Sequence, residues 1–84
     1  MKNITIYTGP MCNYCEAAKR LLKRNNATYN EINIATVDGA MDEMINKAKG
    51  KRTIPQIFFD DQHIGGYDEV RALEKENKLQ DLLK

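Results

Sequence analysis

Residues 3–24 read NITIYTGPMCNYCEAAKRLLKR, and this stretch decides the predicted fold. Its first part alternates in polarity, so Ile4 and Ile6 fall on one face of a short strand, which Gly9-Pro10 ends. After this turn the apolar residues recur with the period of a helix, and one stripe holds Cys15, Ala18, Leu21 and Leu22. A strand followed at once by an amphipathic helix predicts the first βα unit of an α/β domain.

The next segments continue the alternation of strands and helices. Residues 29–34 alternate again and predict a second strand with Ile32 and Ile34 facing inward. Asp38 is placed to cap a second helix that Gly50 closes. The apolar stripe of this helix holds Met41, Met44, Ile45 and Ala48. Because a helix connects the first two strands, a right-handed crossover is expected to make them parallel.

The last part of the chain predicts a hairpin and a final helix. Residues 56–59, QIFF, form an unbroken apolar run that suits a central strand covered on both faces. Asp60-Asp61 then turns the chain into a short strand over residues 62–65. Asp68 can cap the helix that follows, and Leu79, Leu82 and Leu83 end it in one or two further amphipathic turns. The predicted order is β-α-β-α-β-β-α, with a four-stranded mixed sheet between helices.

Length and charge limit the classes of protein that need to be considered. With 84 residues and a formal net charge of +1, the chain predicts a single domain over residues 1–84 that does not bind nucleic acid. Its longest apolar runs are far below the roughly 18 residues that cross a bilayer. We therefore expect a soluble protein away from membranes. We also expect a monomer, although no residue pattern decides this. Residues 1–24 carry five basic groups and one acidic group, so a small anionic ligand could use this half.

Cys12-Asn13-Tyr14-Cys15 is the motif that carries chemistry. It follows a strand directly and opens a helix, which is the setting of a redox C-x-x-C pair. The helix start offers unpaired N–H groups and about half a positive charge, which favours a thiolate at Cys12. Cys15 lies one turn deeper on the apolar stripe, where desolvation keeps its thiol protonated until a mixed disulfide must be resolved.

Two structural alternatives compete with the redox interpretation. A zinc site normally needs four ligands, but the only further candidate is His63, which stands alone in the predicted hairpin and is expected at the surface. A purely structural disulfide across so short a loop would constrain the unfolded chain little. A redox-active pair is therefore the preferred hypothesis. With only two cysteines, the chain is expected in a reducing compartment, which predicts a cytoplasmic location.

The chain closely resembles glutaredoxins of the dithiol type. The resemblance rests on the C-x-x-C motif after Tyr7-Thr8, on the run from Arg52 to Pro55, on the segment from His63 to Asp68, and on the order of elements. It implies a thioredoxin-like fold and glutathione-dependent thiol–disulfide exchange. The implied substrates are protein–glutathione mixed disulfides and protein disulfides, with glutathione regenerating the enzyme.

The resemblance also implies a glutathione site. Cys12 would be the nucleophile and Cys15 the resolving thiol. The implied glutathione-binding residues are Tyr14, Lys51, Arg52, Thr53, Ile54, Pro55, Gly66, Tyr67 and Asp68. Pro55 would be cis and lie opposite the nucleophile, which leaves the backbone of Ile54 free to pair with the cysteinyl part of glutathione.

The two ends of the tripeptide would meet opposite charges. Gly66 would meet the γ-glutamyl carboxylate at the start of a helix, and Asp68 would pair with the α-amino group. Lys51 and Arg52 would meet the glycyl carboxylate. Each residue also has a simpler interpretation: Pro55 as the start of a strand, Asp68 as an ordinary helix cap, and the lysine run as a solvated face.

Two departures from the family pattern leave alternatives open. Many members have lysine three residues before the nucleophile, where this chain has Gly9, so Lys19, Lys51 or Arg52 could substitute. Asn13 stands where proline is common. Some relatives without that proline bind a [2Fe–2S] cluster between two protomers, which would make Cys12 a metal ligand. A third hypothesis is a glutaredoxin-like electron donor that thioredoxin reductase reduces.

Overall fold

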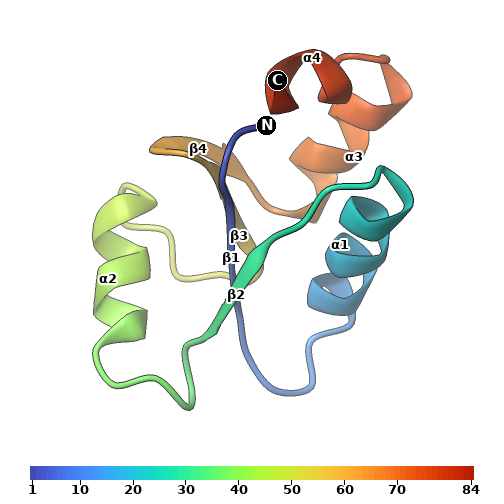
Figure 1. The fold of residues 1–84 in the computed structure, drawn as a ribbon. Helices are drawn as coiled ribbons and strands as arrows, with labels where there is room; N and C mark the ends of the chain where they lie inside the picture. Colours follow the sequence, from blue (N-terminus) through green and yellow to red (C-terminus); the bar gives the residue numbers. More distant parts are fainter.

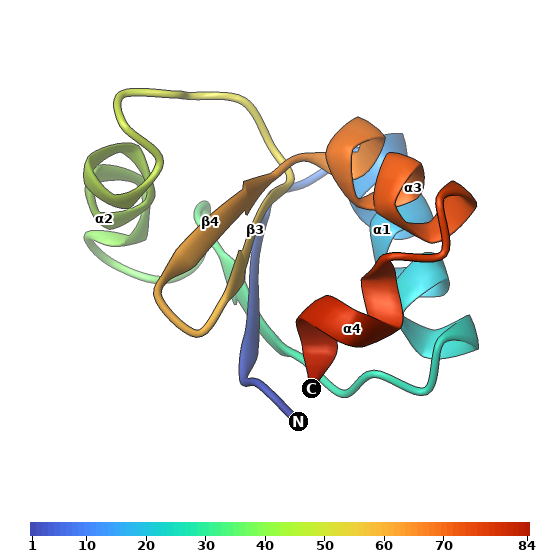
Figure 2. The same cartoon turned by 90° about the horizontal axis from the view of Figure 1, so that it is seen from above.

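The computed structural model describes residues 1–84 as a four-stranded sheet with helices on both faces (Figure 1). Helices α1, α3 and α4 cover one face, and α2 lies alone on the other (Figure 2). The elements are β1 (Ile4–Thr8), α1 (Asn13–Arg24), β2 (Asn30–Asn33), α2 (Ala40–Lys47), β3 (Gln56–Phe59), β4 (Gln62–Gly65), α3 (Tyr67–Lys75) and α4 (Leu79–Leu83).

The predicted mixed sheet is confirmed. The strand order is β2-β1-β3-β4. β1 pairs in parallel with β2, as the crossover through α1 requires, and antiparallel with β3. β3 and β4 form the antiparallel hairpin, with Asp60 in the left-handed region at φ 52° in its turn. The same Asp60 bonds back to Asn3, so the hairpin turn holds the entry to β1.

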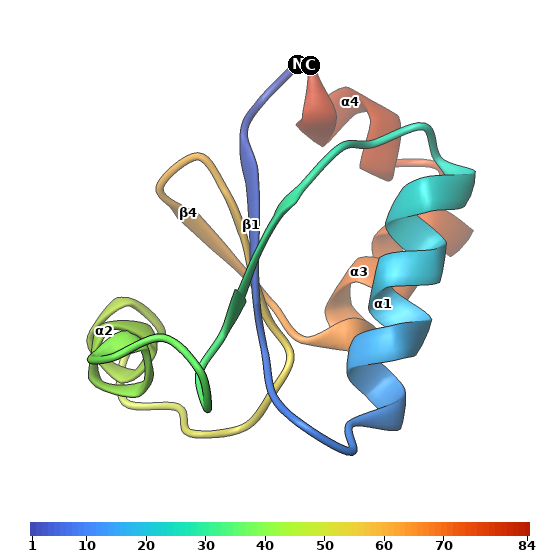
Figure 3. The same cartoon turned by 60° about the horizontal axis from the view of Figure 1, so that its bottom comes forward.

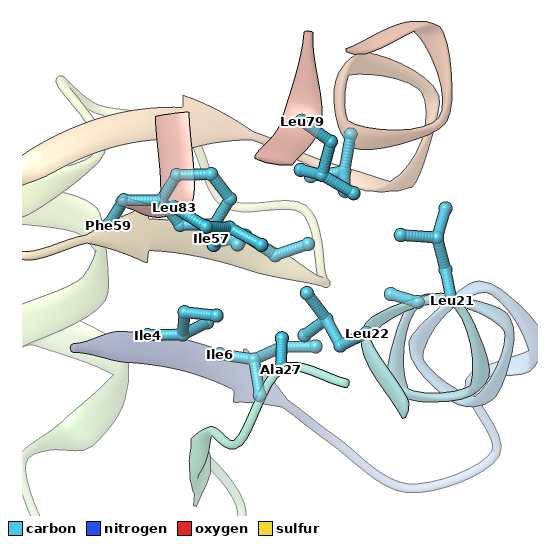
Figure 4. Packing of buried hydrophobic residues seen from close by; sticks show 11 residues of the cluster. Ile4, Ile6, Leu21, Leu22, Ala27, Ile57, Phe59, Leu79 and Leu83 are labelled. Atoms are coloured by element: carbon cyan, nitrogen blue, oxygen red, sulfur yellow. The ribbon is translucent and has the colours of Figure 1, made fainter. Parts of the chain in front are cut away.

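Two apolar clusters fill the two sides of the sheet. The larger one lies between the sheet and helices α1, α3 and α4 (Figure 4) and contains Ile4, Ile6, Ala18, Leu21, Leu22, Ala27, Ile57, Phe59, Val70, Leu79 and Leu83. The smaller one lies under α2 and contains Tyr7, Met44, Ala48 and Phe58. All four residues of β3 are buried, because alternate side chains enter opposite clusters, as expected for a central strand.

Helix α2 begins later than the sequence predicts. Asp38 is not its cap: Gly39 holds that position in the left-handed region at φ 77°, and no side chain caps the helix. Met41, which was expected in the apolar stripe of this helix, is 42% exposed. The segment before the helix forms a backbone-bonded turn, which uses Asp38 as a turn residue. At the far end, Gly50 donates its N–H to the carbonyl of Ile45 at 2.8 Å and closes the helix as expected.

The C-terminal helical segment differs from the prediction in its first residue and in being divided into two helices. The cap of α3 is Gly66, not Asp68, and the carboxylate of Glu69 accepts the Gly66 N–H instead. The last segment is divided into α3 and a separate α4, because Asn77 adopts the left-handed region at φ 59° between them. The two termini lie side by side (Figure 3), and the N–H of Lys2 donates to the carbonyl of Leu83 at 2.8 Å.

Tyr7 anchors α2 to the sheet and provides a stability test. Its hydroxyl donates to Oε2 of Glu43 at 2.7 Å, and its ring meets Phe58 edge-on. Tyr7→Phe keeps the buried ring but loses this bond, so we expect unfolding free energy to fall by about 1 kcal/mol, since water can solvate the exposed Glu43. Urea unfolding measures the change. Tyr14→Phe, at a side chain that is 64% exposed, is the control, and equal midpoints for the two variants would contradict the anchor.

Candidate active site

The loop between β1 and α1 carries the two cysteines to one end of the sheet (Figure 3). Cys12 is the N-cap residue of α1, with extended backbone, and it is partly exposed. Cys15 lies in the first turn of the helix and is 1% exposed. The two are joined in a disulfide, with Cα atoms 5.2 Å apart. The motif therefore presents one accessible sulfur and one buried sulfur, as the spacing predicts.

The first turn of α1 supplies a backbone donor to the Cys12 sulfur. The Cys15 N–H lies 3.1 Å from Sγ of Cys12 and donates to it. Cys12 also accepts the Glu16 N–H at its carbonyl, which closes the first turn. When the disulfide is reduced, the same amide and the positive end of the helix would favour an anionic sulfur over a neutral thiol.

The segment before β3 faces this sulfur. The Ile54–Pro55 bond is cis, as the resemblance implies. Sγ of Cys12 lies 3.8 Å from the carbonyl oxygen of Ile54, across a sequence separation of 42 residues. Pro55 is buried at the start of β3, so it is both the cis residue and the one that leads into the strand.

A groove of about 320 Å³ runs beside this pair of segments. Its walls are Tyr14, Lys51, Thr53, Ile54, Pro55, Gln56, Gly66, Tyr67, Asp68 and Glu69. The structure thus brings together eight of the nine residues that were predicted to bind glutathione. Arg52 is the exception: it is exposed and does not line the groove.

The groove has an aromatic wall and unequal charges. The rings of Tyr14 and Tyr67 lie 5.9 Å apart and tilt by 31°. Lys51 supplies a cation on the side of the cis-proline segment, and Asp68 supplies a carboxylate at the start of α3. The Gly66 N–H that was expected to meet a ligand carboxylate is bonded to Glu69 here, so a ligand would have to displace that side chain to use it.

A comparison of the sequence with protein-family models assigns the chain to a family. The family model described as Glutaredoxin matches residues 4–64, which span the cysteine pair, the cis-proline segment and the sheet. The chain belongs to the glutaredoxin family.

Individual relatives agree with this assignment. Glutaredoxin 3 of Escherichia coli is 44% identical over the full length of both chains, and Glutaredoxin 1 of Rickettsia prowazekii is 43% identical over 99% of this chain and 88% of its own. The solution structure of a Brucella melitensis glutaredoxin superposes with a TM-score of 0.85 at 45% identity, covering 100% of this chain and 90% of that one. A buckwheat glutaredoxin–glutathione complex gives 0.84 at 28% identity, covering 95% and 74%. The expected thioredoxin-like fold is therefore confirmed.

Close packing explains why glycine stands at position 9, where many glutaredoxins have lysine. A Cβ atom at this position would lie 2.7 Å from Cδ1 of Ile54 and 3.7 Å from Cγ1 of Ile34. The Ile54 side chain thus occupies the space that a larger residue at position 9 would need. A lysine there would require Ile54 to change rotamer.

Lys19 is engaged in ion pairs and does not line the groove of this glutaredoxin. Its Nζ lies 2.7 Å from Glu16 and 3.2 Å from Glu31, and these carboxylates, Glu16 first, raise the pKa of Lys19. Glu31 also accepts the Thr8 hydroxyl at 2.7 Å, and this bond is the main cause that lowers the pKa of Glu31. Through Glu31, this cluster connects Thr8 at the end of β1 with Lys19 on α1. Lys51 is left as the cation that lines the groove.

His63 is not the partnerless surface residue that the sequence suggests. Its ring stacks on Phe58 with centroids 4.9 Å apart, and Nε2 lies 2.7 Å from Oε1 of Gln56. Burial lowers the pKa of His63, with Lys51 and Lys49 adding to the effect. Neither the stack nor the bond could be predicted without strand register, because Phe58 and His63 face each other only in the β3–β4 pairing.

Proposed function

We propose that this glutaredoxin is a glutathione-dependent thiol–disulfide oxidoreductase that reduces protein–glutathione mixed disulfides and protein disulfides. The observation that carries the proposal is the groove beside Cys12. Lys51 lines it on the cis-proline segment, whereas the carboxylates of Asp68 and Glu69 line it at the start of α3. Glutathione carries carboxylates at both ends and an ammonium at one, so this distribution of charge suits it.

The cysteinyl part of glutathione would lie along the cis-proline segment. Ile54 would offer its backbone for strand-like pairing, and the carbonyl 3.8 Å from the sulfur marks how near that backbone is to the reacting atom. Lys51 and Thr53 would bind the glycyl carboxylate. Asp68 would bind the α-amino group, and it is free to do so because it does not cap α3. Tyr14 and Tyr67 would cover the peptide.

The first reaction is reduction of a glutathione mixed disulfide. The Cys12 thiolate attacks the glutathione sulfur, the protein–glutathione S–S bond breaks, and the protein leaves as a thiolate that takes up a proton. The enzyme is then a mixed disulfide of Cys12 and glutathione. A second glutathione thiolate attacks that bound glutathione, releases oxidised glutathione and restores the Cys12 thiolate.

The second reaction is reduction of a protein disulfide, and it needs both cysteines. Cys12 attacks one substrate sulfur and forms a mixed disulfide with the protein. Cys15 then attacks Cys12, releases the second protein thiol and forms the Cys12–Cys15 bond that the structure shows. Two glutathione molecules supply the electrons that reopen this bond. Glutathione is thus a cosubstrate, and we propose that the protein works as a monomer in the cytoplasm.

Coupled turnover separates the two possible electron donors. With a glutathionylated peptide, NADPH, glutathione and glutathione reductase should support rapid turnover, whereas thioredoxin reductase should not. Lys51→Gln should raise KM for the glutathionylated peptide about fivefold, because one charge-assisted bond is lost. Lys49→Gln, a lysine outside the groove, is the control. Turnover only with thioredoxin reductase would overturn the proposal.

An iron–sulfur cluster remains a separate hypothesis raised by Asn13. Cys15 is buried, and no group of three or more His, Cys, Asp or Glu side chains gathers in the chain to hold a metal. One chain could therefore offer a cluster only Cys12, and further ligands would have to come from a second chain and from glutathione. Anaerobic reconstitution with iron, sulfide and glutathione tests this: a coloured dimer would support it, and a colourless monomer would exclude it.

A further inference from the structure

Gln56 is an amide buried in an otherwise apolar strand. It is the first residue of β3, it is 2% exposed, and Ile57, Phe58 and Phe59 follow it. Burying an amide is unfavourable unless its donors and acceptor are paired. In this protein no buried side-chain nitrogen or oxygen lacks a partner. The strand therefore keeps a polar residue whose hydrogen bonds can be followed individually.

The Gln56 amide joins β4 to the cis-proline segment. Its Nε2 donates to the Thr53 carbonyl at 2.9 Å and to the Thr53 hydroxyl oxygen at 3.1 Å. Its Oε1 lies 2.7 Å from Nε2 of His63. A carbonyl can only accept, so the NH₂ group must face Thr53 and the oxygen must face His63. It follows that Nε2 of His63 carries a proton and donates it to Gln56.

These bonds determine which hydrogen bonds the Thr53 hydroxyl can still make in the groove. Its hydroxyl oxygen already accepts from Gln56, so its own proton is left to donate elsewhere. Thr53 is exposed and lines the groove together with Lys51. A hydroxyl donor and an ammonium on one wall form a site for a carboxylate. The Thr53 carbonyl fixes the sense of this chain of bonds, and the His63 N–H supplies the donor that the buried Gln56 oxygen would otherwise lack, which holds the amide in place.

We infer that Gln56 and His63 are positioning residues that orient the Thr53 hydroxyl toward a carboxylate of glutathione. The inference rests on the proposed function and deepens it. Gln56 borders the groove but is only 2% exposed, whereas His63 does not line the groove and acts on Thr53 through Gln56. The network extends the glutathione site from the groove wall to the edge strand β4, through three side chains that are well separated from the cysteines in the sequence.

Gln56→Met is the direct test. Methionine matches the length of glutamine and can be buried, but it offers Thr53 no donor. KM for a glutathionylated peptide should rise about fivefold while kcat stays within about twofold, because binding is weakened and Cys12 is untouched. Gln62→Met places the same change on an exposed β4 residue and should leave both constants unchanged. Equal KM values for Gln56→Met and wild type would overturn the inference.

His63→Phe keeps the inference testable if Gln56→Met does not fold. Phenylalanine preserves the stack on Phe58 but leaves the buried Gln56 oxygen without its donor, which loosens the amide that bonds to Thr53. KM should rise about twofold to threefold at unchanged kcat. Nitrogen NMR of the wild type should show a proton on Nε2 of His63, and a ring with only Nδ1 protonated would refute the bond direction. If wild type itself shows no glutathione-dependent turnover, the proposed function fails first. If it turns over and neither variant changes KM, only this inference fails.

Discussion

Cys12→Ser is expected to abolish reduction of both glutathionylated and disulfide substrates, by on the order of a thousandfold or more. A serine hydroxyl at a helix start remains protonated at neutral pH, whereas sulfur in the same place is readily ionised. The accessible sulfur belongs to Cys12, and the Cys15 N–H donates to it from 3.1 Å away. No second thiol can replace it, because Cys15 lies in the first turn of α1 with its side chain facing the core and is only 1% exposed.

Cys15→Ser is the matched variant, since it makes the same chemical change one turn along the helix. It should retain turnover on a glutathionylated peptide, where glutathione itself resolves the intermediate, and lose reduction of protein disulfides. The turnover of each variant is measured on each of the two substrates with glutathione and glutathione reductase, which gives four rates. Retained activity in Cys12→Ser, or full disulfide reduction in Cys15→Ser, would show that the two roles are wrongly assigned.

Among the charged side chains, Glu74 is expected to contribute most to the free energy of unfolding. It accepts two hydrogen bonds from Arg24 at 2.7 and 2.9 Å and one from Asn25, which joins α3 to α1. These bonds, Arg24 first, lower the pKa of Glu74 to about 2. A carboxylate with a lowered folded-state pKa stabilises the protein above its unfolded-state pKa. The stabilisation should therefore be complete above about pH 5 and disappear as the pH falls toward 2.

Glu74→Gln should lower the free energy of unfolding by about 2 kcal/mol at pH 7, less than the pKa shift alone would give, because Arg24 is half-exposed and solvent screens the pair. Urea titrations from pH 7 down to pH 2 would show the wild type and the variant converging. Glu76→Gln changes an exposed glutamate paired only with Lys78 and should have little effect at any pH. A constant difference between wild type and Glu74→Gln across the whole range would contradict the electrostatic account.

Local pattern was enough to predict the elements but not their ends. The alternation around Ile4 and Ile6 and the helical stripe through Cys15 correctly predicted β1 and α1, since each follows from burying one face. Asp38 and Asp68 were wrong as caps. Each can serve a turn, a cap or a ligand equally well by composition, and only packing of the helix against its neighbours decides which residue begins it.

In the candidate site, too, the sequence predicted some residues, and only the structure revealed others. Lys51 and Thr53 line the groove, whereas Arg52 does not, because the side on which a residue projects from a loop depends on the folded backbone. Gln56 went unnoticed inside an apolar run. A glutamine before three buried residues could have raised the question of its partner, but the partner itself, His63, is found only once β3 and β4 are in register.

The order of residues alone determined which strands and helices form, that two sulfurs stand one helical turn apart, and that the first of them opens a helix. These properties depend on neighbours within a turn or on the alternation of one strand. Folding decided which distant groups meet: Ile54 with Cys12, Glu74 with Arg24, and His63 with Gln56. Such contacts depend on strand order and register, which many segments set together by burying their apolar faces at the same time.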